Sequence, residues 1–369
     1  MEQIGAKGVG AETWKRLAVY RGLAAVLVVF GHCVQVFVRP AAPELAPYTG
    51  LLAQASVMMF FVVSGFSIAA SADKVFQHPF PIRQYVIKRA GRILPPLLFA
   101  VGVMCLLDWL VPYVFVDESY LFLPQERMAR EGYHFNWSET LGALFFLNGF
   151  FSTTPLVNGP LWSLSYEVWL YAIYFFLFIA LKLKRWIFFV VAFAIIAILA
   201  KYDSSGARNF FLKYSLVWFS GALVYIVVIG RWGVINNILR CLIVVFACLS
   251  AALAGYFGWL FVVNDMSYDI ARYNVAFGFA FALYLLLTRP AMPSVMYAVF
   301  KPISHFGYTL YLIHFPIYLF VFGAFQTYLM RGVGSAWLIG MGAMVCSMIV
   351  AYMAAKIVEQ RKLFIGKVV

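Results

Sequence analysis

The chain has 369 residues, of which 64% are hydrophobic and only 12% are charged, whereas a soluble domain is about half apolar and about a quarter charged. This composition excludes an ordinary soluble enzyme and indicates a polytopic membrane protein. The net charge of +13 does not indicate a nucleic-acid-binding protein. The basic residues flank apolar runs, a pattern typical of charges that orient membrane helices.

Apolar runs of about twenty residues predict membrane-spanning helices, because that length crosses the hydrocarbon core. The alternation of polar and apolar residues that is typical of a β-barrel is absent from the sequence. The expected spans, in chain order, are residues 17–38, 50–72, 91–116, 160–181, 186–202, 208–229, 239–263, 270–288, 303–329 and 335–358.

An eleventh run, at about residues 138–152, is short for a span. If it does not cross, 20 of the 28 lysine and arginine residues fall on one side of the membrane, as the positive-inside rule favours. We therefore predict an all-α bundle of ten spanning helices plus one short outer half-helix, with both termini in the cytoplasm. The transmembrane domain is expected over residues 15–358, with cytoplasmic tails at 1–14 and 359–369.

The first span carries two ionisable side chains, Arg21 and His32. Ionisable residues inside a span are costly and mark function by default. Their spacing of eleven residues places them on one helix face, roughly 16 Å apart along the axis. Arg21 is expected near a membrane surface and His32 near the midplane, where an imidazole suits general base catalysis. The alternative is a snorkelling arginine and a hydrogen-bonded interior histidine.

The second and third predicted spans add small and basic residues. Ser64 and Gly65 leave room for a thin ligand arm, or only allow close helix packing. Arg89 and Arg92 are neighbours on a helix, and paired guanidinium groups are a natural clamp for phosphate. Lys88 accompanies them, although an ordinary positive-inside charge explains it equally well.

Two later motifs bring further polar groups toward the midplane. Glu167 lies about seven residues into its span, near the expected depth of His32, with Trp162 and Tyr166 on its face or at the mouth above it. An aromatic belt and a structural ion pair are the alternatives. His314 lies deep in a later span beside Tyr311. The histidines show no metal-binding spacing, so we expect no metal.

Five motifs occur in the order in which they occur in the acyltransferase-3 family of integral membrane acyltransferases, and the chain resembles that family. The motifs are Arg21-x10-His32, the run Phe60–Phe66, Arg89-x-x-Arg92-Ile-Leu-Pro, Pro160–Glu167 and Tyr308–Pro316. The resemblance covers about residues 15–358. It implies a ten-span fold and transfer of an acyl group, commonly acetyl, from cytoplasmic acyl-CoA to a hydroxyl, often of an extracytoplasmic sugar. The family's essential residues map onto Arg21, His32, Arg89 and Arg92.

The resemblance and the motifs together give a mechanistic hypothesis. Acetyl-CoA or another short acyl-CoA docks from the cytoplasm, with Arg21, Arg89, Arg92 and Lys88 at its phosphates and its arm passing Ser64. A carbohydrate or glycolipid acceptor enters from outside, past residues Trp162, Tyr166 and Tyr311. His32 acts as general base, and either Glu167 or His314 supports it; a covalent acyl-histidine step stays open. The expected location is the bacterial cytoplasmic (inner) membrane. The expected partners therefore include the lipid bilayer, and we expect no nucleic acid to bind.

Two alternatives are weighed against this hypothesis. A succinyltransferase acting on periplasmic glucans would need an additional cation near the midplane for its dicarboxylic acyl chain, and none is obvious in the sequence. A transporter or flippase also places polar residues at the midplane. However, the sequence shows no inverted repeat, and its one-sided arginine cluster suits an anionic cofactor held at one face.

Overall fold

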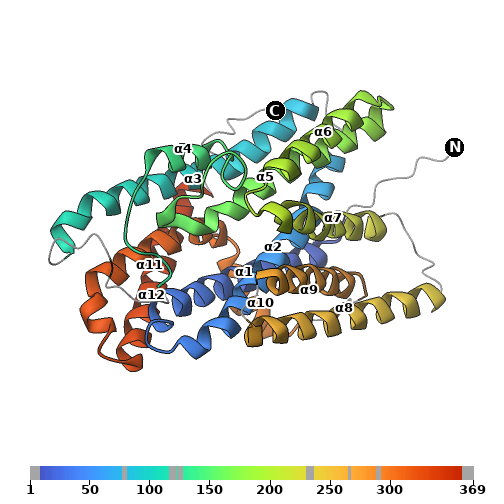
Figure 1. Ribbon diagram of the computed structural model, residues 1–369. Coiled ribbons are helices and arrows are strands. Elements are labelled where there is room, and N and C mark those ends of the chain that lie inside the picture. The colour runs from blue at the N-terminus through green and yellow to red at the C-terminus, as the bar shows by residue number, and fades with distance from the viewer. Residues whose placement is uncertain are drawn as a thin grey trace.

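The computed structural model describes residues 9–76, 81–115, 122, 128–229, 237–264, 267–287 and 292–359. Apart from one isolated bridge between Asn148 and Ser152, the regular structure of these residues is helical (Figure 1). The long helices are α1 Ala11–Cys33, α2 Ala46–Val75, α3 Pro81–Val114, α5 Trp162–Leu183, α6 Ile187–Tyr202, α7 Phe210–Ile229, α8 Asn237–Asn264, α9 Ser267–Leu287, α11 Gly307–Leu329 and α12 Val333–Val358. The shorter elements are η1 Val34–Val38, η2 Pro43–Leu45, α4 Trp137–Leu144, η3 Leu156–Leu161, η4 Gly206–Arg208 and α10 Ser294–Ile303.

Nine helices in the described part of the chain are long and apolar enough to cross a membrane, and α6, with 16 residues, is a shorter apolar helix. Each of the ten predicted spans therefore contains a helix. The least buried of the nine, α8, packs against α9 and leaves apolar side chains exposed, which is the expected state of a helix that faces lipid. The prediction of an all-α polytopic bundle is confirmed, and the chain is an integral membrane protein.

Two short elements differ from the prediction. The half-helix expected over residues 138–152 is helical only in α4, which ends at Leu144, because Phe146 and Gly149 adopt positive φ values of 58° and 85°. Asn136 begins α4 by accepting hydrogen bonds from the backbone of residues 138 and 139, a standard N-cap. The amphipathic helix α10 was not predicted; it precedes α11 and packs against α1.

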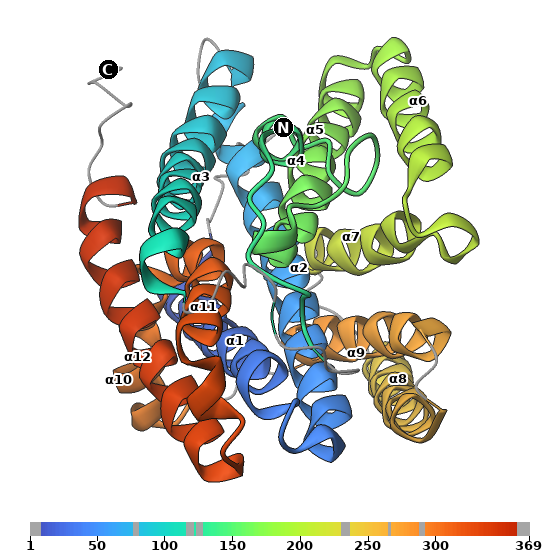
Figure 2. The same ribbon diagram turned by 60° about the vertical axis from the view of Figure 1, so that its left-hand side comes forward.

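Three helices form the centre of the bundle. Helix α2 runs through the middle, between α1, α11 and α12 on one side and α7 to α9 on the other (Figure 2). Helix α11 is the most completely buried of the nine long apolar helices. Helix α1 continues into the π-helical turn η1 directly after Cys33. Such turns widen the helix locally and are frequent at functional sites, and here the turn begins two residues after His32.

Helices α2 and α7 cross at very short range because each presents a glycine to the backbone of the other. A Cβ atom on Gly65 would lie 2.0 Å from the carbonyl oxygen of Trp218, and one on Gly221 would lie 1.9 Å from that of Val62. Of the two interpretations of the Ser64-Gly65 pair, close packing therefore applies to Gly65. Ser64, one residue earlier, instead lines a cavity and donates a hydrogen bond to Glu167.

The crossing gives a stability prediction. The substitution Gly65→Ala should lower the thermal unfolding midpoint of the detergent-purified protein by several degrees, because overpacking costs about 1–3 kcal/mol. Gly102→Ala in α3 is the matched control, since no atom of a described residue lies within 4 Å of the Cβ it would add. The midpoints are measured by thermal unfolding with a fluorescence signal that does not depend on thiol labelling. Equal midpoints for the two variants would contradict the close crossing.

Candidate active site

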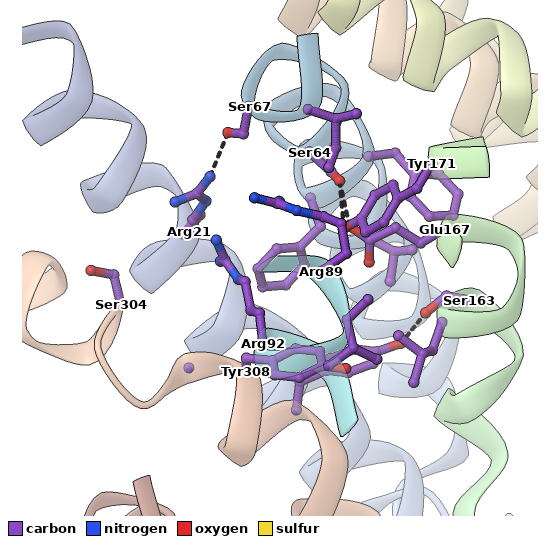
Figure 3. A pocket seen from close by; sticks show the side chains of 18 of the residues that line it. Arg21, Ser64, Ser67, Arg89, Arg92, Ser163, Glu167, Tyr171, Ser304 and Tyr308 are labelled. Atoms are coloured by element: carbon purple, nitrogen blue, oxygen red, sulfur yellow. Dashed lines mark hydrogen bonds between the residues drawn. The ribbon is translucent and has the colours of Figure 1, made fainter. Parts of the chain in front are cut away.

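A cavity lies between α1, α2, α3, α5 and α11, and the bundle centre described above forms its walls. Figure 3 shows the polar side chains that converge on it. The residues that line it are Arg21, Val57, Phe60, Phe61, Ser64, Ser67, Ile68, Arg89, Arg92, Ile93, Ser163, Leu164, Glu167, Tyr171, Ser304, Gly307, Tyr308, Tyr311 and Glu359. Its wall combines charged and hydroxyl side chains with apolar and aromatic ones, and α2 contributes both kinds.

Three arginines meet at one end of this cavity. Arg21 of α1 and the pair Arg89 and Arg92 of α3 all point their guanidinium groups into the same space (Figure 3). Arg21 donates to Ser67 Oγ at 2.5 Å, and Arg89 donates to Ser71 Oγ at 3.1 Å. Arg92 is solvent-exposed, so the cavity opens to the surface at the arginine end.

The arginine charges are not balanced by an ion pair with any described residue. Within the described residues, no carboxylate oxygen lies within 4.0 Å of a guanidinium nitrogen of Arg21, Arg89 or Arg92. Two buried donors at the same end, Arg89 Nε and the hydroxyl of Tyr308, have no hydrogen-bond partner among the residues that the structure describes. Buried polar groups are normally hydrogen-bonded, and guanidinium groups match phosphate oxygens well. The chemistry of this end of the cavity therefore suits an anion.

Glu167 lies in the same cavity, where it accepts hydrogen bonds from Ser64 Oγ and from the hydroxyl of Tyr171 (Figure 3). It interacts electrostatically with Arg21 and Arg89 at longer range. The structure thus places Glu167 with the arginines and not against His32. Of the two supports weighed for His32, Glu167 is not in contact with it.

His32 instead contacts His314. The distance from His32 Nδ1 to His314 Nε2 is 2.8 Å, and the two rings are nearly parallel, with an interplanar angle of 14°. The ring of Phe315 meets His32 edge to face at a centroid distance of 5.3 Å. His314 is fully buried, whereas His32 is half-buried. Helices α1 and α11 therefore hold a hydrogen-bonded histidine pair at the centre of the bundle.

The backbone of α11 fixes the proton positions in this pair. His314 Nδ1 lies 3.1 Å from the carbonyl oxygen of Leu310, which can only accept, so we assign the Nδ1 proton to His314. The Nε2 atom of neutral His314 is then an acceptor, and His32 Nδ1 must donate to it. The remaining nitrogen, His32 Nε2, carries a lone pair, and no described residue hydrogen-bonds it. A neutral imidazole held in this tautomer can accept a proton at Nε2.

Tyr311 connects the cavity to the histidine pair. Its ring lines the cavity and lies 6.0 Å from the ring of His314. Its hydroxyl lies 2.6 Å from Ser163 Oγ and donates to the carbonyl of Pro160 at 2.9 Å. His32 itself is not among the lining residues, so the cavity ends at Tyr311 and Ser163, directly before the histidines.

The other predicted site residues lie away from the cavity. Lys88 does not line it. Tyr166 donates to Asp203 Oδ1 at 2.9 Å, and Trp162 packs against Tyr166 and Tyr214 with centroid distances of 5.3 and 5.8 Å. These two aromatic residues thus join α5 to the segment after α6 and to α7. Their assignment to substrate binding stays a prediction.

Several residues of the site were not predicted. The serines of α2 were missed apart from Ser64, although Ser64, Ser67 and Ser71 recur at intervals of three and four and so share a helix face. That periodicity was the available signal. Tyr171, four residues after Glu167, carried the same signal. Glu359 reaches the cavity from the end of α12, and its position depends on tertiary packing that no local pattern shows.

Glu359 gives a binding prediction. It accepts hydrogen bonds from Thr309 N at 2.7 Å and Thr309 Oγ1 at 2.5 Å, it interacts with Arg92, and burial raises its carboxyl pKa. The ionised carboxylate opposes an anion at the arginines, so Glu359→Gln should tighten CoA binding roughly two- to tenfold at neutral pH. Titration calorimetry checks this, with Glu12→Gln, at an exposed residue, as the control. Weaker CoA binding in Glu359→Gln would contradict the assigned charge effect.

The fold and the site together define an integral membrane protein in which a cavity with three arginines at one end leads to a hydrogen-bonded histidine pair. Residues 14–356 match the family model described as an acyltransferase domain, and the chain belongs to the acyltransferase-3 family. The resemblance seen in the five motifs is thereby confirmed. Comparisons with curated proteins and with solved structures found no match.

Proposed function

We propose that the protein transfers an acyl group, acetyl in the simplest case, from cytoplasmic acyl-CoA to a hydroxyl of an extracytoplasmic carbohydrate. The observation that carries the proposal is the group of three arginines that meet at the open end of one cavity without a carboxylate partner among the described residues. Such a site suits the phosphates of CoA, and family membership supports acyl transfer in general.

The cavity suits the rest of the donor as well. With the phosphates at Arg21, Arg89 and Arg92, the pantetheine arm would follow the wall of α2 past Ser64. The hydroxyl of Tyr308, which no described residue hydrogen-bonds, is available to an amide carbonyl of that arm. The acyl group would then arrive at Tyr311, one helical turn before His314. A small movement of the Tyr311 side chain would bring the thioester to the histidine pair.

The chemical step follows from the assigned tautomers. His32 Nε2 takes the proton of the acceptor hydroxyl while the hydroxyl oxygen attacks the thioester carbonyl. The new C–O bond forms, the C–S bond breaks, and the proton passes from His32 to the leaving thiolate, which gives an ester and free CoA. His314 is a positioning residue: it holds the Nδ1 proton of His32 and disperses the charge of the imidazolium.

The membrane location and the acceptor rest on the sequence. The positive-inside pattern supports cytoplasmic termini, which puts the arginine end of the cavity on the cytoplasmic side. The histidine pair then lies toward the opposite side, where an extracytoplasmic sugar arrives. We infer a bacterial cytoplasmic membrane from the resemblance to the acyltransferase-3 family. No step of this reaction needs a metal ion.

The proposal is tested with the purified protein in liposomes and acetyl-CoA labelled in its acetyl group. Labelled acetyl should move to an added oligosaccharide, and CoA thiol should be released in equal amount. Thermal shift should show stabilisation by CoA and acetyl-CoA. Mass spectrometry of cell-surface polysaccharide, with and without the gene, identifies the natural acceptor. A protein that moves labelled sugar across the bilayer but releases no thiol from acetyl-CoA would contradict the proposal and favour a transporter.

A further inference from the structure

Arg130 lies in the segment between α3 and α4, and its side chain is held in a defined position. Its Nε donates to the carbonyl of Leu156 at 2.9 Å, and its Nη1 donates to the carbonyl of Ala129 at 2.7 Å. The guanidinium lies over the ring of Phe315, 5.4 Å from the ring centroid. Two carbonyls and one aromatic face therefore fix this cation.

The segment η3 is shaped to admit the guanidinium. A Cβ atom on Gly159 would lie 2.2 Å from Arg130 Nη2, so any larger residue at position 159 would displace the side chain. Leu156, which accepts from Arg130, belongs to the same segment. A freely moving surface arginine needs no such fit. The packing therefore indicates that the position of the Arg130 guanidinium is important.

The charge of Arg130 has no counterion in the described part of the chain. No carboxylate oxygen there lies within 4.0 Å of it, and its Nη2 makes no hydrogen bond with a described residue. Burial lowers the pKa of Arg130, yet an arginine stays protonated in proteins. A partly buried cation without an anion is costly, and the cost is relieved when a ligand supplies the anion.

Arg130 and the histidine pair share a neighbour. The ring of Phe315 lies 5.3 Å from His32 and 5.4 Å from the Arg130 guanidinium carbon, and the charge of Arg130 acts on His32. Along α11, Tyr308 and Tyr311 line the cavity, and His314 and Phe315 follow. Arg130 therefore lies beyond the histidines, at the end opposite the arginine cluster of Arg21, Arg89 and Arg92.

This position has a consequence for the reaction of the proposed function. Protonation of His32 to an imidazolium is disfavoured by the like charge of a nearby guanidinium, unless an anion lies near both groups. We propose that Arg130 binds a carboxylate or phosphate group that one of the two substrates carries close to its reacting atom. The anion comes from an acidic acceptor, such as a uronic acid or a sugar phosphate, or from a dicarboxylic acyl chain, such as succinyl. In this proposal Arg130 supplies a cation close to His32, as the succinyl alternative would need.

The experiment measures binding, so that it does not depend on turnover. The liposome-embedded protein is titrated with methyl glucuronide, glucose 1-phosphate and methyl glucoside, and separately with succinyl-CoA and acetyl-CoA. The variants are Arg130→Gln and Arg130→Lys. Arg208→Gln is the matched control, because Arg208 also lies over a phenylalanine ring, at 5.1 Å, and donates to a backbone carbonyl, at 3.2 Å, but makes no contact with the histidine pair.

The proposal expects wild-type protein to bind an acidic glycoside at least tenfold more tightly than methyl glucoside, or succinyl-CoA at least tenfold more tightly than acetyl-CoA. Arg130→Gln should lose that preference, Arg130→Lys should keep part of it, and Arg208→Gln should keep all of it. The pair that shows the preference identifies the substrate that carries the anion. Equal binding within each pair in the wild type, or a preference that survives in Arg130→Gln, would overturn the proposal.

A second arm separates this proposal from the proposed function on which it rests. Thiol release from each acyl-CoA is followed with each glycoside as acceptor. An Arg130-dependent binding preference without thiol release would retain the anion site and reject acyl transfer. Thiol release without any binding preference that depends on Arg130 would retain acyl transfer and reject the anion site.

Discussion

Replacing His32 with alanine should abolish acyl transfer while the affinity for CoA stays nearly unchanged. The tautomers fixed by Leu310 and His314 leave His32 Nε2 as the free base, and a positioned general base contributes about 10²- to 10⁴-fold to rate. His32 does not line the cavity that holds the arginines, so its removal should change the Kd for CoA by less than about twofold. Initial rates of thiol release and equilibrium titration with CoA check the two halves of this expectation.

Two further variants make this result specific. His305→Ala is the matched control, because His305 is exposed and lies outside the histidine pair, and it should keep the wild-type rate. His314→Asn should give an intermediate rate with an altered pH profile, because the Nδ1 proton of His32 loses its acceptor. A His32→Ala protein that retains a tenth or more of the wild-type rate would show that the base is elsewhere.

Neutralising both arginines of α3 should have the second large effect, on binding. Each charged hydrogen bond to phosphate is worth about 1.5–3 kcal/mol, so each of Arg89→Gln and Arg92→Gln should weaken CoA binding by roughly 10- to 100-fold. The double variant should weaken binding of CoA far more than binding of phosphate-free pantetheine. Titration with radiolabelled acyl-CoA measures this, at two salt concentrations because exposed charges are screened.

Arg83→Gln is the control for the double variant. Arg83 lies on the same helix but is exposed and does not line the cavity, so its loss tests the effect of net charge alone. Lysine at positions 89 and 92 should restore part of the affinity, because it keeps the charge without the planar fork. Unaltered affinity in the double glutamine variant would exclude the phosphate role of these residues.

The helical architecture could be predicted from the sequence because a lipid environment imposes simple requirements on a spanning segment. A spanning segment must be apolar for about twenty residues and must satisfy its own backbone hydrogen bonds, and both conditions are visible locally. The prediction was wrong about the extent of α4 and did not include α10. Both are short helices, whose ends depend on tertiary contacts. The break after Leu144 follows from positive φ values at Phe146 and Gly149, which no hydrophobic pattern encodes.

The polar site was predicted in part for the same reason. Arginines and histidines inside apolar runs stand out, so Arg21, His32 and His314 could be named, and helical spacing paired Arg89 with Arg92. The sequence did not show which residues would meet. Glu167 was expected at the depth of His32, but it bonds Ser64 and Tyr171. Arg130 was overlooked because it lies in a polar loop, where an arginine is unremarkable until folding places it over Phe315.

The central claim is that a donor held at the arginine cluster and an acceptor from the opposite side meet at His32. A structure of the protein with a thioether analogue of acetyl-CoA, which cannot transfer its acyl group, tests this most directly. The account predicts the CoA phosphates against Arg21, Arg89 and Arg92, Tyr311 displaced from Ser163, and the acyl carbon about 3–4 Å from the position of the attacking oxygen beside His32 Nε2. An analogue whose acyl end stops short of a still-closed Tyr311, or whose phosphates lie away from the arginines, would contradict it.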